Sequence, residues 1–236
     1  MCLKYLTDIW NEVVTWCHEG VTPIAYGALY NWYAADGEIT SAGWHIPTFA
    51  DIITLFGELD PGFIPASEWS EISGGKLKET GLTHWRTPNT DATNEVGFNG
   101  RGSAFRDGGS GLFFDFTDAM YIWSEEYSAT EGYNIVLGGF DHGEAWVSTY
   151  DKTYGTSIRP VKDSTILTHG QTGTYVGNDG KVYNTICMGT QEWASSNLAE
   201  TKYRDGTTIP VVTDNATWAA LVTGAMCYYN NDPLYL

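Results

Sequence analysis

The sequence predicts an α+β fold of short antiparallel strands, two short helices and long loops, preceded by a further helix at its start. Three observations predict this class. Apolar residues recur in steps of three and four over residues 1–20, short segments after Gly111 alternate apolar and polar residues, and a polar stretch separates these regions. Helical and strand periodicities in separate parts of one chain are typical of α+β domains.

The first predicted element is a helix over residues 1–20. Its apolar positions share one face, at Leu3, Leu6, Trp10, Val13 and Cys17. Gly20 is suited to end the helix. Two roles stay open: the helix packs on its own domain, or it serves docking or oligomerisation, because two heptads are marginally stable alone.

Aromatic residues dominate the next stretch, residues 26–48, which we interpret as a buried segment followed by a turn. Its last residue, Thr48, can accept a hydrogen bond from the free backbone N–H groups of a helix over residues 49–59. A long polar region with many glycines follows, in which Trp85 and Phe98 are expected to anchor the chain to the core.

Short strands are expected from Gly111 onward. They are LFFDF, AMYIWS, GYNIVLGGF, EAWVSTY and TSIRPVKD, and they predict an antiparallel meander. Asn178-Asp179-Gly180 predicts a hairpin turn between TGTYV and KVYNTICMG. A short helix around residues 218–222, begun near Thr213 or Asp214, and a strand-like AMCYYN end the chain.

Composition limits the classes of partner. The chain has 12 basic and 29 acidic residues, a net charge of −17, so nucleic acid and anionic membrane surfaces are poor partners. No stretch approaches the roughly 20 apolar residues that span a bilayer, and charged residues interrupt any signal-peptide pattern in residues 1–20. Aromatic residues make up 14%, which suggests rings in a binding face as well as in an irregular core.

The cysteines show no metal-type spacing. Cys2, Cys17, Cys187 and Cys227 are far apart, so buried free thiols are favoured over two disulfides, which the count alone would permit.

Nine segments together carry a resemblance to a known family. They are GTQEWASSNL, TKYRDGTTIP, VTDNATWAAL with TGAMCYYNND, YGALYNWYA, GWHIPT, GGKLKETGLTHW, ATNEVGF, YIWSEEY and YGTSIRPVKD. The chain resembles the Fibrobacter succinogenes major paralogous domain, a branch of the C-type lectin-like fold. The resemblance implies a domain over residues 21–236, with the N-terminal helix outside it.

The order of these segments differs from that of the family, which implies a circular permutation. Residues 21–163 resemble the C-terminal part of the family domain and residues 181–236 its N-terminal part, while residues 164–180 supply a connection and a hairpin. The reading predicts that residues 226–231 lie close to residues 26–33. The alternative is that the last 70 residues complete a neighbouring chain.

Two further implications come from the resemblance. Family members often carry one cysteine before the GWH segment and another in the closing strand, where this chain has Thr40 and Pro160. The absence of both cysteines is expected for a chain that folds in a reducing cytosol. Components of a bacteriophage virion fold there and are released without a classical signal peptide. We therefore expect it on a virion or an extracellular surface.

Catalysis is not expected. Residues 100–163 lack the cysteines that formylglycine-generating enzymes of the same fold would need, and the acidic residues show no convergent pair for glycoside hydrolysis. No HExxH pattern or phosphate-binding loop occurs, and His45 is interpreted as structural. No cofactor is expected, although Asp115, Asp118 and Asp141 could coordinate Ca²⁺ through their carboxylate oxygens.

The predicted ligand-binding face lies within residues 125–151. Its residues are Tyr127, Tyr133, Asn134, Asp141, His142, Trp146 and Tyr150, which combine rigid rings with short polar groups. Adenine-directed diversification by a retroelement would enrich these residue types. Trp123 and the apolar residues Ile135, Val136, Leu137 and Val147 are expected in the core instead.

These observations favour a non-catalytic ligand-binding module, an adhesin or receptor-binding component for a cell-surface glycan or protein. The alternative is a structural or decoration protein of a virion or surface assembly. In either case we expect a homo-oligomer or a larger assembly, with no insertion into a membrane.

Overall fold

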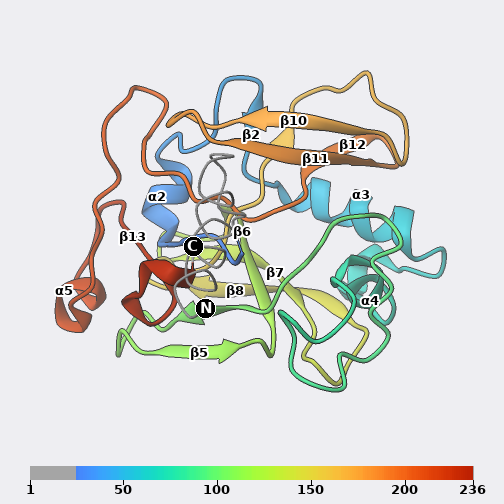
Figure 1. The fold of residues 1–236 in the computed structure, drawn as a ribbon, viewed down its shortest axis with the longest axis horizontal. Helices are drawn as coiled ribbons and strands as arrows, with labels where there is room; N and C mark the ends of the chain where they lie inside the picture. The colour runs from blue at the N-terminus through green and yellow to red at the C-terminus, as the bar shows by residue number, and fades with distance from the viewer. Residues whose placement is uncertain (1–24, 236) are drawn as a thin grey trace, which may run out of the picture.

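The computed structural model describes residues 25–235, so the helix predicted over residues 1–20 lies outside them. Two larger sheets form the layers of the fold (Figure 1). The first contains, in spatial order, β10 (Thr172–Val176), β11 (Val182–Met188), β12 (Gln191–Ala194), β9 (Val161–Lys162) and β2 (Trp44–His45). The second contains β3 (Trp69–Ser70), β8 (Ala145–Asp151), β7 (Glu131–Leu137), β6 (Met120–Glu126), β4 (Ser103–Arg106) and β5 (Phe113–Phe116).

The pairing confirms part of the predicted meander and corrects the rest. β6, β7 and β8 are consecutive antiparallel neighbours, as expected. β5 instead pairs with β4, which meets β6 in parallel through Ala104 and Met120, and β9 belongs to the other sheet. The meander prediction was wrong at both ends because alternation identifies a strand but not its partner.

The main core lies between the two sheets. Ile122, Ile135 and Val147 face it from the six-stranded sheet, and Ile186 and Trp193 face it from the five-stranded sheet. The predicted anchors Trp85 and Phe98 belong to this core, as does Leu137. Trp123 is buried in a second cluster, and Val136 is buried on the opposite side of β7, so all the residues predicted to be internal are buried. Burial of these large side chains supplies most of the apolar stabilisation.

Helices close the sides of the core. α3 (Phe49–Leu59) has the predicted bounds, and a capping box joins Thr48 and Asp51 at its start. The helix predicted around residues 218–222 is α5 (Asn215–Ala219), which is capped by the predicted Asp214 but begins and ends three residues earlier than predicted. The structure adds α2 (Trp32–Asp36) and α4 (Ser73–Leu77), together with the 3-10 segments η1 (Pro65–Ser67), η2 (Tyr229–Asn231) and η3 (Pro233–Tyr235).

A small two-stranded sheet joins the beginning and end of the described chain. β1 (Leu29–Tyr30) pairs antiparallel with β13 (Met226–Cys227), with Leu29 opposite Cys227. This confirms the predicted proximity of residues 226–231 and residues 26–33, and the pairing forms within one chain. Cys187 and Cys227 are buried free thiols, as predicted, while Cys2 and Cys17 lie outside the described residues.

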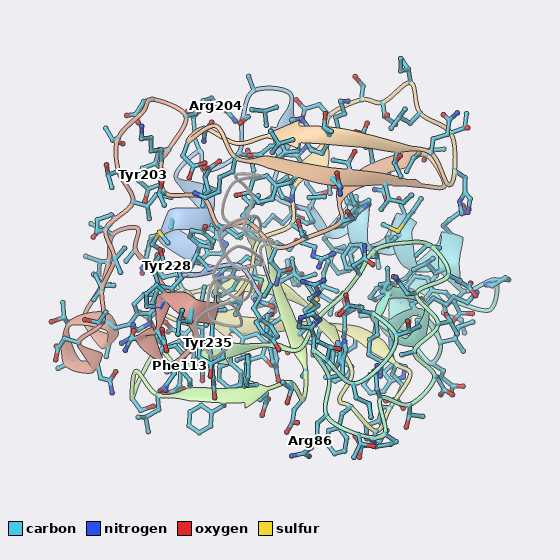
Figure 2. All side chains as sticks on the ribbon, viewed as in Figure 1. Arg86, Phe113, Tyr203, Arg204, Tyr228 and Tyr235 are labelled. Atoms are coloured by element: carbon cyan, nitrogen blue, oxygen red, sulfur yellow. The ribbon has the colours of Figure 1, made fainter. Side chains whose placement is uncertain are left out.

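Aromatic stacking fastens the C-terminal segment to β5. The Tyr229 ring stacks on Phe116 with centroids 3.9 Å apart, and Tyr235 contacts the same ring at 5.2 Å. Tyr26 contacts Phe116 from the other end of the described chain, at 4.8 Å. Figure 2 shows Phe113 and Tyr235 on this side of the molecule.

Candidate ligand-binding face

One face of the six-stranded sheet carries a row of mostly aromatic side chains with one residue from each strand. The row consists of Trp69, Trp146, Val136, Tyr121, Phe105 and Phe114. Residues directly opposite one another in neighbouring strands share a face of the sheet, so the register alone assembles the row. We call this row, with the adjacent Tyr150 and Tyr154, the aromatic face.

Phe105 is the centre of the ring contacts. Its centroid lies 5.6 Å from Phe114, 5.0 Å from Tyr121, 6.4 Å from Tyr150 and 5.6 Å from Tyr154. Such pairs each contribute about 0.5–1.5 kcal/mol beyond area burial. The rings therefore hold one another in fixed orientations, which lowers the ordering cost of binding to them.

The row is most exposed at its two ends. Trp69 is 43% exposed and Phe114 is 44% exposed, whereas Val136 and Tyr121 form a buried floor between them. Trp69 stacks on the half-buried Trp146, with centroids 4.9 Å apart and planes at 14°. The face therefore offers flat apolar surface that stays accessible after folding.

A cavity of about 420 Å³ borders the Trp69 end of the face. Phe63, Ile64 and Ile72 line it with Trp69, and Asp60 and Glu71 supply carboxylates. This mixture of an apolar wall and a few polar groups is common in sites for small ligands.

Two tyrosines of the aromatic face form hydrogen bonds with carboxylates. The Tyr121 hydroxyl donates to Asp115 over 2.5 Å. Burial raises the pKa of Tyr121, and the bond to Asp115 raises it further. Burial and a hydrogen bond to Asp107 likewise raise the pKa of Tyr154 to about 12. Both phenols stay neutral near pH 7. The edge of the aromatic face, which we call its rim, therefore combines ring surfaces with the hydrogen-bond acceptors Asp107 and Asp115.

The structure divides the predicted binding residues among several regions. Trp146 and Tyr150 belong to the aromatic face. Asn134 lies on the same side of β7 but is fully buried, with its Nδ2 donating to Thr156 Oγ1. Asn134 is therefore a core residue, and its prediction as part of an exposed binding face was wrong.

Tyr127 and Tyr133 lie away from the aromatic face. Tyr133 projects from β7 to the core side of the sheet, where it packs on Phe49 at 5.1 Å. Tyr127 follows β6 and contacts Tyr133 at 4.9 Å. The expectation of a single face was wrong here, because successive residues of a strand point to opposite sides.

Asp141 and His142 are exposed in the loop between β7 and β8. Buried Lys78 fixes this loop, donating from Nζ to the backbone oxygen of His142 at 2.6 Å and of Gly139 at 3.3 Å. Burial lowers the pKa of Lys78 to about 8. Lys78 therefore fixes the backbone of the loop, while the side chains of Asp141 and His142 are exposed to solvent.

The three aspartates considered for Ca²⁺ do not converge. Asp115 accepts from Tyr121, and Asp118 pairs with Arg86 at 3.1 Å. Arg86, labelled at the edge of the molecule in Figure 2, also lies over the Phe140 ring at 3.8 Å. No three His, Cys, Asp or Glu side chains of residues 25–235 are grouped to hold a metal ion.

Sequence reasoning missed most of the row. Trp69 and Phe105 lie in strands of two and four residues, which are too short to show a period. Phe114 and Tyr121 were placed in strands, but only the register shows which side they share with Trp146. The available signal was the excess of aromatic residues over what a core requires.

Comparison with known proteins identifies a family for this chain. The model of the Fibrobacter succinogenes major domain family matches residues 14–162. No curated protein and no solved structure matches the chain. Within residues 25–235, no helix combines the length and apolar composition that crossing a bilayer requires.

Proposed function

The chain belongs to the Fibrobacter succinogenes major domain family, and we propose that it is a non-catalytic module that binds a neutral cell-surface glycan on its aromatic face. The observation that carries the proposal is the row of five aromatic side chains and Val136 across six strands, ending in the exposed Trp69 stacked on Trp146. Sugar rings present C–H faces that stack on such side chains.

The length and charge of the face support a neutral oligosaccharide. Six strands are separated by five intervals of about 4.8 Å, roughly 24 Å in all, which accommodates more than one sugar residue. Asp107 and Asp115 line the rim, and the whole chain carries −17. Carboxylates accept hydrogen bonds from sugar hydroxyls but repel anionic ligands.

The finer fold assignment is also a proposal. We infer a C-type lectin-like domain in circularly permuted order. Two pairings support it: β1 with β13, and β9 with β12 through Val161 and Trp193. In such a domain the natural C-terminus would lie after β9 and the natural N-terminus before β11, and β12 brings this first hairpin next to β9. The module would act as an adhesin or receptor-binding component on an extracellular or virion surface.

A glycan-array screen followed by calorimetric titration tests the proposed function. Trp69→Ala should weaken binding by about 2 kcal/mol, roughly 30-fold, since exposed tryptophans dominate binding surfaces. Its thermal midpoint should change little, because Trp69 is 43% exposed.

Tyr127→Ala is the matched control. Tyr127 is 53% exposed but lies outside the aromatic face, so binding should keep its affinity. Absence of any glycan ligand, or equal affinity of Trp69→Ala and the wild type, would contradict the proposal.

A further inference from the structure

A separate cavity of about 470 Å³ lies between residue Ala25, β11 and the segment after β12. Most of its lining residues are of polar types, and two are arginines: Ala25, Asn99, Arg101, Arg159, Val182, Tyr183, Asn184, Ser195, Ser196 and Asn197. A cavity of this volume matches small organic ligands. None of its lining residues belongs to the aromatic face.

Arg159 brings an unpaired charge to this cavity. Its side chain is fully buried and lies over the Phe98 ring at 4.1 Å. Nε donates to Asn197 Oδ1 at 2.7 Å, and the other two nitrogens donate to the backbone oxygens of Phe98 and Asn99. A guanidinium has five N–H groups, so two have no partner among residues 25–235, and no carboxylate in that range pairs with Arg159.

The second arginine has its own carboxylate. Arg101 donates from Nη2 to Glu79 at 2.7 Å and from Nε at 3.1 Å. Burial lowers the pKa of Arg159, Arg101 lowers it further, and Glu79 raises it. Arg101 is therefore already paired with a carboxylate, whereas Arg159 has no carboxylate partner among residues 25–235, in a chain whose net charge is −17.

Neutral donors complete the lining. The side chains of Asn184, which is exposed, and Ser196, which is half-buried, form no hydrogen bonds within the described part of the chain. Amide and hydroxyl groups in such positions orient a polar ligand without adding charge.

We propose that this cavity binds a small organic monocarboxylate, with the ligand carboxylate facing Arg159. A planar carboxylate matches the planar fork of a guanidinium. The single guanidinium charge of Arg159 suits a single negative charge better than a phosphate, which carries about −1.5 to −2 at pH 7. The remaining part of the ligand contacts Asn184 and Ser196 at the cavity rim. This site is independent of the proposed glycan site.

Calorimetric titration of the full chain with acetate, D-glucuronate, D-glucose and inorganic phosphate tests the proposal. Acetate or D-glucuronate should bind at one site per chain, with affinity that falls as salt rises. D-glucose and phosphate should bind at least about tenfold more weakly. If neither carboxylate binds, or if phosphate binds as tightly, the proposal is overturned.

Asn184→Asp is the decisive variant. It is isosteric and exposed, so it should fold normally while placing a negative charge at the rim, and the carboxylate affinity should fall about five- to tenfold. Ala129→Asp adds the same charge in the exposed turn between β6 and β7, outside the lining, and should bind like the wild type. Equal affinity of Asn184→Asp and Ala129→Asp contradicts the site. Trp69→Ala should bind carboxylates normally, which separates this result from the glycan test.

Discussion

At the scale of single residues, His45 shows how one side chain joins three segments. Nε2 lies 3.0 Å from Asp51 at the start of α3, and Nδ1 lies 2.7 Å from Asp163 after β9. His45 itself belongs to β2. The sequence predicted a structural histidine in the GWHIPT turn, and these contacts agree with that role.

His45 should make stability depend on pH. The hydrogen bond to Asp51 raises the pKa of His45 against the opposing effect of burial, and Asp163 raises it as well. Its contribution is therefore fully present below the unfolded-state pKa of about 6.5 and is lost as pH rises through the raised folded-state pKa. The bond to His45 and bonds to Thr48 lower the pKa of Asp51 to about 2 despite burial, so its contribution is lost only in acid.

The His45→Gln variant should consequently lose more stability at pH 5.5 than at pH 8.5. We expect a difference on the order of 0.5–1 kcal/mol, reduced by solvent screening at this partly exposed site, in urea unfolding at the two pH values. His142→Gln provides the control, because the His142 side chain is 56% exposed and solvent screens its contacts with Asp141 at 3.4 Å and Glu144 at 3.7 Å. A His45→Gln effect that does not depend on pH would contradict the ion-pair explanation.

At the scale of elements, α3 illustrates a helix defined by its own sequence. Thr48 Oγ1 accepts from the Asp51 N–H at 3.1 Å, and Asp51 Oδ2 accepts from the Thr48 N–H at 2.9 Å. The buried face then repeats at Ile52, Leu55, Phe56 and Leu59. Both signals are local, which is why the predicted bounds agree with the structure.

Replacing Thr48 by alanine should remove the capping hydrogen bond and cost about 1 kcal/mol of unfolding free energy. Thr48→Ser keeps the acceptor and should remain close to the wild type. Thr54→Ala, at an exposed site of the same helix, controls for helix propensity. Chemical unfolding curves measure all three, and equal stability of Thr48→Ala and Thr48→Ser would rule out the cap as a stabilising feature.

The strands of the candidate site show the opposite case. β3 has two residues, and its place is set by the pairing of Trp69 with Trp146, which lies far along the sequence. No local pattern contains that information. The sequence could therefore predict β7 and β8 and several of their rings, but the aromatic face exists only through long-range register, and Tyr133 and Trp146 could not be assigned to opposite sides.

At the scale of the whole molecule, the last part of the chain occupies an internal place in the fold. β11 and β12 lie between β10 and β9 in the five-stranded sheet (Figure 1). Backbone bonds extend this placement, because Ala28 N donates to Leu198 O and Leu198 N donates to Ile158 O, both distant in sequence. The order of the segments could be compared with that of a family from the sequence alone. Only the structure shows that one five-stranded sheet contains both β2, from early in the chain, and β10, β11 and β12, from late in the chain.

The ends of the described chain also meet, which allows a direct test of the permuted order. The rings of Tyr26 and Tyr235 lie 6.3 Å apart, while Ile166, in the connection after β9, is 96% exposed. A variant that joins Leu236 to Met1 by a short glycine-serine linker and begins at Leu167 should therefore keep the native near-UV circular dichroism, with a thermal midpoint within roughly 10 °C of the wild type. The same linker with the chain opened between Ile135 and Val136, inside β7, breaks a buried strand and should fail to fold. If opening at Ile166 is as damaging as opening inside β7, the proposed natural ends, after β9 and before β11, are wrong.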